Sequence, residues 1–343
     1  TAIDAITDAV GEVLSGTAKN HIEDINRKPV YDKQRIVTTG GHFAYLKIAE
    51  GCDKHCSYCI IPKVRGNYRS IPMESLLEQA RSLAAFGVKE LILVAQETTL
   101  YGVDLYGKKS LPKLLRRLCE IEGLSWIRIL YCYPEEITDE LIDTIKNEDK
   151  ICKYLDIPIQ HASDRILKRM GRRTTSEELV KIITKLRAAI PDICLRTTLI
   201  TGFPDETKED HEALMTFVDE MEFDRLGVFL YSPEENTPAA SFENQIAEEV
   251  KQERQADLME LQQEIAFENA QKMTGKSLMV MVEGKVPDEN AYVARSYKDA
   301  PNVDGFVFIQ TARELMTGDF VHVKITGAHE YDLIGVIEDE FTK

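Results

Sequence analysis

The hydrophobic pattern of the chain changes near residue 43. From there on, short apolar runs alternate with segments whose apolar residues recur at helical spacing. The apolar runs predict six strands, at Ala44–Ala49, Glu90–Ala95, Trp126–Tyr131, Tyr154–Pro158, Leu195–Thr201 and Leu226–Tyr231. The segments between them predict helices at Glu74–Phe86, Leu111–Ile121, Thr138–Asn147, Ser176–Ile190 and Lys208–Glu220.

Six strands that alternate with helices indicate parallel βα units and an α/β fold. A complete eight-fold TIM barrel takes about 250 residues, which is more than this stretch offers. We therefore expect an open (βα)6 partial barrel, TIM-like in topology. Its catalytic groups should lie at the carboxyl ends of the strands.

Other patterns flank this region. Residues 2–14 predict a helix that a polar linker follows, and Ser241–Gln271 predict one acidic helix. After Gly275, turn residues separate five short strands, at Leu278–Val282, Tyr292–Arg295, Gly305–Gln310, Asp319–Ile325 and Leu333–Ile337. These strands predict a small all-β barrel. The predicted domains are therefore a helix and linker at 1–35, the partial barrel at 36–240, a connecting helix at 241–272 and the all-β barrel at 273–343.

The composition is that of an ordinary globular chain, with 43% hydrophobic and 29% charged residues. No apolar run approaches the roughly 20 residues of a membrane helix, so we expect no membrane contact. Seven cysteines, an odd number, do not indicate a disulfide framework, and a reducing, cytoplasmic location is expected. The net charge of −16 repels nucleic acid and attracts basic partners, although it could also serve solubility alone.

Three cysteines lie together in one short loop after the first predicted strand. Cys52, Cys56 and Cys59 offer soft thiolate ligands, which suit an iron–sulfur cluster or zinc. A 4Fe–4S cluster takes four thiolates, so three leave one iron open to a ligand such as S-adenosylmethionine (SAM). The alternative is a structural zinc site with His42 or His55 as the fourth ligand. The other four cysteines are scattered singly and are expected to be apolar fillers.

The cysteine spacing and the segments after it resemble the radical SAM methylthiotransferases. The motifs that carry this resemblance are Gly51-Cys52 through Ile60-Ile61-Pro62, Arg65-Gly66, Arg69-Ser70, Ala95-Gln96-Glu97-Thr98-Thr99, Tyr101-Gly102, Ile166-Leu167-Lys168-Arg169-Met170, Gly202-Phe203-Pro204 and Tyr231-Ser232. Two positions depart from the family pattern, which usually has glycine where Asp205 and Asn236 stand. The match runs from about residue 43 to the C-terminus, and the all-β barrel resembles a TRAM domain, an OB-like barrel.

The resemblance implies a 4Fe–4S cluster with one open iron, SAM as cofactor and an electron donor such as flavodoxin. Members of the family also have an N-terminal domain in which three more cysteines hold a second 4Fe–4S cluster. No cysteine precedes Cys52 in this sequence. We therefore expect a fragment that lacks that domain and cleaves SAM without completing methylthiolation; a docking module without chemistry is the alternative.

Several residues are candidates for contact with SAM. The resemblance places Gln96 and Glu97, at a strand end, near the SAM amino group, and it includes Gly202. Tyr58, inside the cysteine loop, is expected beside the adenine. Other candidates are Gln160, His161 and Arg196, of which His161 could equally be structural. Arg196 needs an anionic partner, either the SAM carboxylate or a protein carboxylate in a salt bridge. Arg172 and Arg173 are expected in a solvated turn.

The charge of the last domain bears on the substrate. One branch of the family modifies an adenosine in tRNA, and the other modifies the β-carbon of an aspartate in the twelfth protein of the small ribosomal subunit. Residues 273–343 contain seven Lys/Arg and 12 Asp/Glu. A tRNA-binding domain should be basic, whereas an acidic one suits a basic ribosomal protein. We therefore expect the aspartate-modifying branch and regard tRNA as an unlikely partner.

Overall fold

The computed structural model describes residues 5–27 and 37–338. Six strands form one sheet, β1 (Phe43–Lys47), β4 (Glu90–Val94), β5 (Trp126–Ile129), β6 (Ile151–Asp156), β7 (Cys194–Thr201) and β8 (Arg225–Leu230). They are adjacent in chain order, and every pairing is parallel. The sheet does not close, so the predicted open (βα)6 partial barrel is confirmed.

Five helices cover the outer face of this sheet, α3 (Met73–Ala85), α5 (Leu111–Cys119), α6 (Asp139–Asn147), α8 (Ser176–Ala189) and α9 (Lys208–Met221). Three of them begin at a threonine whose hydroxyl accepts a backbone hydrogen bond, at Thr138, Thr175 and Thr207. The threonines at 175 and 207 belong to complete capping boxes. These caps fix the residues at which the three helices begin, and the starts agree within one residue with those predicted from the sequence.

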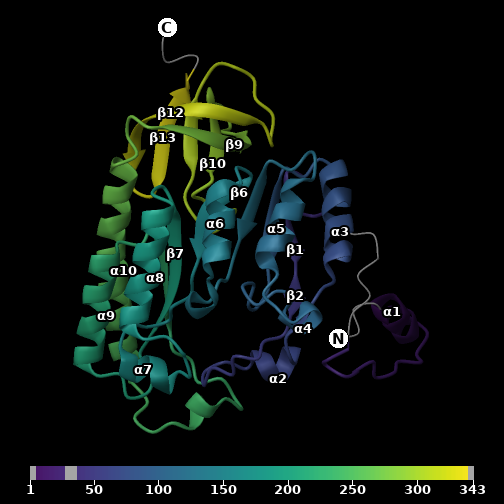
Figure 1. Cartoon of the computed structure of the whole chain (residues 1–343), viewed down its shortest axis with the longest axis vertical. Helices are drawn as coiled ribbons and strands as arrows, with labels where there is room; N and C mark the ends of the chain where they lie inside the picture. Colours follow the sequence, from purple (N-terminus) through teal and green to yellow (C-terminus); the bar gives the residue numbers. More distant parts are fainter. Residues whose placement is uncertain (1–4, 28–36, 339–343) are drawn as a thin grey trace.

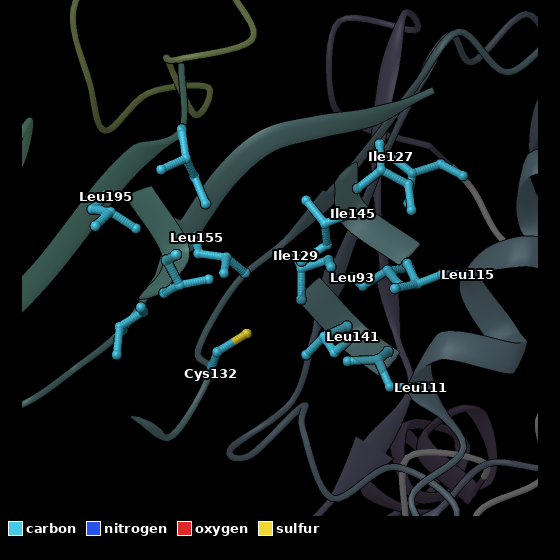
Figure 2. Close-up of a cluster of buried hydrophobic side chains, with 14 of the residues drawn as sticks. Leu93, Leu111, Leu115, Ile127, Ile129, Cys132, Leu141, Ile145, Leu155 and Leu195 are labelled. Carbon is cyan, nitrogen blue, oxygen red and sulfur yellow. The ribbon is translucent and has the colours of Figure 1, made fainter. Parts of the chain in front are cut away.

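The core lies between the strands and these helices. Figure 2 shows Leu93, Ile127 and Ile129 of the sheet facing side chains of α5 and α6, among them Leu115 and Ile145. All five side chains are fully buried. Alternate residues of each strand point outward, towards the helices. The residues between them therefore point inward and line the interior of the partial barrel.

Shorter elements complete the first part of the chain. They are α1 (Ile6–Leu14), β2 (Ala49–Glu50), α2 (Ile61–Arg65), β3 (Arg69–Ser70), α4 (Val103–Tyr106), α7 (Asp164–Arg169) and the 3-10 turns η2 (Pro134–Glu136) and η3 (Pro238–Ser241). The predicted helix at 2–14 is confirmed over α1, and its first residues lie outside the described ones. No described helix has the length and apolar character needed to cross a membrane.

The predicted helix over Ser241–Gln271 is wrong at its start, because α10 spans Glu248–Gln271. The preceding segment is held by tertiary contacts instead. Phe242 packs edge-on against Phe203, with ring centres 6.2 Å apart. Asn244 has a left-handed backbone (φ 56°), and its carbonyl oxygen accepts a hydrogen bond from the Asp205 amide at 3.1 Å. A left-handed residue cannot continue a right-handed helix, so α10 begins later.

The remaining strands form a closed five-stranded barrel, which confirms the predicted small all-β domain. They are β9 (Ser277–Lys285), β10 (Ala291–Ser296), β11 (Val307–Gln310), β12 (Phe320–His329) and β13 (Asp332–Ile337), in the order β10-β11-β13-β12-β9. Each of the six predicted strands of the sheet differs from the observed strand at one end or both. The largest difference is that β6 begins at Ile151 rather than at Tyr154, and β1 ends before Ile48.

The small barrel docks on the amino-terminal edge of the sheet. Contacts with it begin at the first residue of several strands: Trp126 packs on Phe320 with ring centres 4.9 Å apart, and Arg225 pairs with Asp299 at 2.7 Å. In Figure 1 the small barrel lies above the sheet, whereas α2 and α7 lie below it. The carboxyl edge of the sheet, where catalytic groups are expected, is therefore the edge away from the small barrel.

Candidate active site

The three clustered cysteines lie in the loop between β2 and α2, at the carboxyl edge of the sheet. Gly51 opens this loop with φ +78°, and a Cβ there would lie 2.1 Å from the carbonyl oxygen of Asn67. Only glycine fits such a backbone and such an approach. The Gln96 side-chain oxygen accepts a hydrogen bond from the Gly51 amide at 2.9 Å. Gln96, a predicted cofactor contact, therefore anchors the start of the cysteine loop.

The thiols suit an iron–sulfur cluster better than a single metal ion. Cys52 and Cys56 are buried, and Cys59 is half-buried. Among the described residues, no three His, Cys, Asp or Glu side chains converge on a point that could hold one ion. The thiolates of a 4Fe–4S cluster each bind a different iron, so they need not converge. Cys56 and Cys59 line a cavity of about 420 Å³ that also borders Asn236 and Pro238.

The zinc alternative fails for His42. His42 lies before β1, at the opposite edge of the sheet, where its Nε2 is 2.7 Å from a Glu283 carboxylate oxygen. His55 lies in the loop but is exposed. Burial raises the pKa of Cys52 to about 11 and also raises the pKa of Cys59. Burial therefore disfavours the free thiolates, and a bound metal such as the iron of a cluster would offset this effect.

Glu97 has an unused oxygen beside this loop. The side chain is fully buried, and its Oε1 accepts a hydrogen bond from the Thr99 amide at 2.9 Å. Its Oε2 has no hydrogen-bond partner in the described protein and lies 4.0 Å from Lys54 Nζ. Burial raises the pKa of Glu97 to about 7. Since a buried acceptor without a donor is costly, this oxygen is suited to a ligand N–H group.

Tyr58 and Gln160 also lie at this end of the barrel. The Tyr58 ring meets Phe203 edge-on, with centres 6.5 Å apart, and burial raises its pKa well above the usual value. Gln160 has a left-handed backbone (φ 73°), and its amide donates to the Thr198 carbonyl at 2.9 Å. Their contact with SAM stays a prediction.

His161 and Gly202 have structural partners. His161 is fully buried; its Nδ1 accepts from the Ser163 amide at 2.9 Å, and its Nε2 lies 3.7 Å from Glu206. At Gly202 (φ +71°), a Cβ would lie 2.2 Å from Cγ of the buried Lys251. Both arrangements favour a role in packing over direct contact with a cofactor.

Arg196 already has carboxylate partners. Its Nη1 lies 2.9 Å from Asp156, and its Nε lies 3.7 Å from Asp304 of the small barrel. Arg196 is the third residue of β7, so it lies towards the edge away from the cysteines. These contacts favour the salt bridge, which the sequence left open, over the SAM carboxylate.

The sequence missed two buried cations near the cysteines. Lys54, inside the loop, has its Nζ 3.0 Å from Glu135 and also pairs with Glu136. Arg172 was expected in a solvated turn, but only its neighbour Arg173 is exposed; Arg172 itself is 7% exposed. The local sequence carries no signal that separates the two arginines, because their burial depends on Tyr133, almost 40 residues earlier in the chain.

A parallel partial barrel with three cysteines in the loop after its first strand is the arrangement of radical SAM enzymes. The model of the radical SAM superfamily matches residues 46–218, and that of the TRAM domain matches residues 274–337. The fold class and the class of enzyme expected from the sequence are therefore confirmed.

Curated relatives define the family more closely. The chain is 62% identical over 338 residues to the ribosomal protein uS12 methylthiotransferase RimO of Lachnoclostridium phytofermentans, an alignment that covers 98% of this chain and 77% of that protein. It is 50% identical to the RimO of Clostridium kluyveri, covering 92% and 70% of the two chains, and 49% identical to that of Desulfitobacterium hafniense, covering 95% and 74%. The chain therefore belongs to the RimO family of radical SAM methylthiotransferases.

Proposed function

We propose that this protein modifies ribosomal protein uS12, adding a methylthio group to the β-carbon of an aspartate. The observation that carries the proposal is the 62% identity to a uS12 methylthiotransferase over nearly the whole chain. The site is consistent with it, since three thiols share one loop at the carboxyl edge of a partial barrel.

In this proposal Cys52, Cys56 and Cys59 hold a 4Fe–4S cluster, and SAM binds beside it. The bound groups supply an electron that breaks the sulfonium C–S bond, and a deoxyadenosyl radical that abstracts hydrogen. The chain holds and orients them. The free Oε2 of Glu97 accepts from the SAM amino group, Gln96 anchors the cysteine loop, and Tyr58 lies against the adenine.

Two further partners belong to the proposal. A second 4Fe–4S cluster, expected in an N-terminal domain of the family, takes part in sulfur delivery, and a donor such as flavodoxin supplies the electron. The substrate uS12 is basic, which suits a chain with a net charge of −16. For the same reason tRNA should bind weakly.

Anaerobic reconstitution with iron and sulfide tests the site. The loaded protein should be brown, bind about four irons per chain, and release deoxyadenosine from SAM after reduction. Replacement of Cys52, Cys56 and Cys59 by Ala should abolish the visible absorption, whereas Cys119→Ala, remote from the loop, should retain it. Colour that persists in the triple variant would refute the cluster assignment.

A second experiment tests the substrate. Binding of uS12 and of tRNA to the loaded protein is measured at the same ionic strength, because both interactions weaken with salt. Tighter binding of uS12 than of tRNA is expected. Tighter binding of tRNA would move the assignment to the tRNA-modifying branch.

A further inference from the structure

Two cations flank one tyrosine ring next to the cysteine loop. Tyr133, in the segment after β5, has its hydroxyl 3.9 Å from the Cys56 sulfur. The Arg172 guanidinium lies 4.2 Å from the centre of this ring, and Lys54 Nζ lies 4.9 Å from it. Three segments far apart in the sequence thus bring two positive charges and an aromatic hydroxyl to Cys56.

The two cations differ in how their charge is balanced. Lys54 is paired with two carboxylates, Glu135 and Glu136. Arg172 is more than nine-tenths buried, and no carboxylate of the described chain lies within ion-pair distance of it. Its Nη2 donates to the Pro158 carbonyl at 2.8 Å, but Nε and Nη1 have no hydrogen-bond partner among the described residues.

A buried guanidinium with two nitrogens whose N–H groups are unused is costly unless an anion meets it. Arg172 stacks on the ring whose hydroxyl lies 3.9 Å from the Cys56 sulfur, and the proposed function makes this sulfur anionic. A cluster held by thiolates carries negative charge, which increases by one when it accepts an electron. A positive charge in a buried, low-dielectric site favours that reduced state.

We propose that Arg172 is a positioning and tuning residue for the cluster at Cys56, which it stabilises in the reduced form through its uncompensated charge and unused N–H groups. This inference rests on the proposed function, because it requires a cluster at the three cysteines. It adds a residue outside the cysteine loop to the machinery that makes reduction of the cluster possible.

Arg172→Gln removes the charge and can be compared with Arg173→Gln, the same change at an exposed neighbour. The full chain is reconstituted anaerobically and titrated with dithionite and mediators without SAM, and the reduced cluster is followed by electron paramagnetic resonance. Arg172→Gln should shift the midpoint to a more negative potential, while Arg173→Gln should leave it unchanged. Arg172→Lys, which keeps the charge, should recover most of the shift.

If Arg172→Gln does not take up iron, a second variant tests the effect of local charge on the cluster by removing a negative charge instead of a positive one. Glu135→Gln removes a carboxylate 3.0 Å from Lys54, so it should move the midpoint to a less negative potential. A midpoint that does not respond to Arg172→Gln, or to Glu135→Gln where the first variant cannot be loaded, overturns the inference. The inference is also overturned if Arg172→Gln leaves the midpoint potential unchanged but weakens SAM binding, because Arg172 would then bind the SAM carboxylate. A wild-type protein that binds no cluster refutes the proposed function instead.

Discussion

Arg295 of the small barrel donates a hydrogen bond to Glu90, the first residue of β4, at 2.7 Å. Arg128 of β5 donates to the other oxygen of the same carboxylate, also at 2.7 Å. At most 1% of any of these three side chains is exposed. One buried carboxylate thus holds two arginines at the junction of the two domains.

Loss of Glu90 should therefore uncouple the domains. Glu90→Ala leaves the buried Arg128 without its carboxylate and leaves Arg295 with Glu283 alone. Breaking a buried ion pair in this way typically costs about 3–5 kcal/mol. We expect a lower unfolding temperature in calorimetry, with separate transitions for the small barrel and the sheet. Arg313→Ala, an exposed change in the small barrel, should have little effect. A single transition at the wild-type temperature in Glu90→Ala would contradict this view of the junction.

The junction should also make stability depend on pH through His42. Burial disfavours the charged imidazole, but the hydrogen bond and charge of Glu283 outweigh this and raise the pKa of His42 above 6.5. A histidine whose pKa is higher in the folded than in the unfolded protein stabilises the fold fully at pH values below the unfolded pKa. This contribution disappears as the pH rises through the pKa of the folded state. The pKa of Glu283 is lowered from 4.5, so its contribution disappears in acid.

The free energy of unfolding should therefore fall as the pH rises above about 6.5. His42→Gln should remove much of this dependence, as urea unfolding at several pH values can show. If the free energy of unfolding falls equally steeply with pH in the wild type and in His42→Gln, a group other than His42 causes the loss of stability at alkaline pH.

Gly202 is expected to be required by packing. A left-handed backbone costs an alanine about 1–2 kcal/mol, and the overlap with Lys251 adds to this because the lysine is fixed by its bond to the Tyr231 carbonyl at 2.9 Å. Gly202→Ala should therefore lower the free energy of unfolding by at least this amount. Gly284→Ala, at a position with open space and an ordinary backbone, is the matched control. Unchanged stability with weaker SAM binding would restore Gly202 as a cofactor contact.

Arg196→Met distinguishes a salt bridge from a SAM contact. Removal of the partner of the buried Asp156 should cost about 1–3 kcal/mol of stability and leave SAM affinity unchanged. Calorimetry of SAM binding to the loaded variant, together with its unfolding curve, measures both. A variant of normal stability that binds SAM poorly would instead support the carboxylate contact predicted from the sequence.

The charge of the small barrel gives the last prediction. Glu283, Asp299 and Asp332 are unsuitable for charge reversal, because each has a structural bond, to His42, to Arg225 and to the Phe306 amide respectively. The exposed acidic residues Glu289, Glu314 and Glu330 are suitable.

Reversal of these three charges to Lys should slow association with uS12 on the order of 10-fold at low salt and less at high salt. The matched control reverses Glu177, Asp219 and Glu220, which are exposed on the helices of the partial barrel. Equal slowing in both variants would show that the net charge, and not the small barrel, steers the substrate.

Local features of the sequence determined much of this molecule. The alternation of apolar runs and helical segments predicted all six strands of the sheet, and Thr138 marked a helix start because a cap needs only its own next turn. The spacing of Cys52, Cys56 and Cys59 predicted the cluster loop, since three residues within eight positions share one loop whatever surrounds them.

Only the tertiary structure decided which charged groups meet. Arg196 pairs with Asp156, Arg172 stacks on Tyr133, and α10 begins late because Asn244 bonds to a distant loop. These contacts join residues tens of positions apart. Whether a buried charge is balanced depends on its neighbours in space, and the periodicity of one segment carries no information about them.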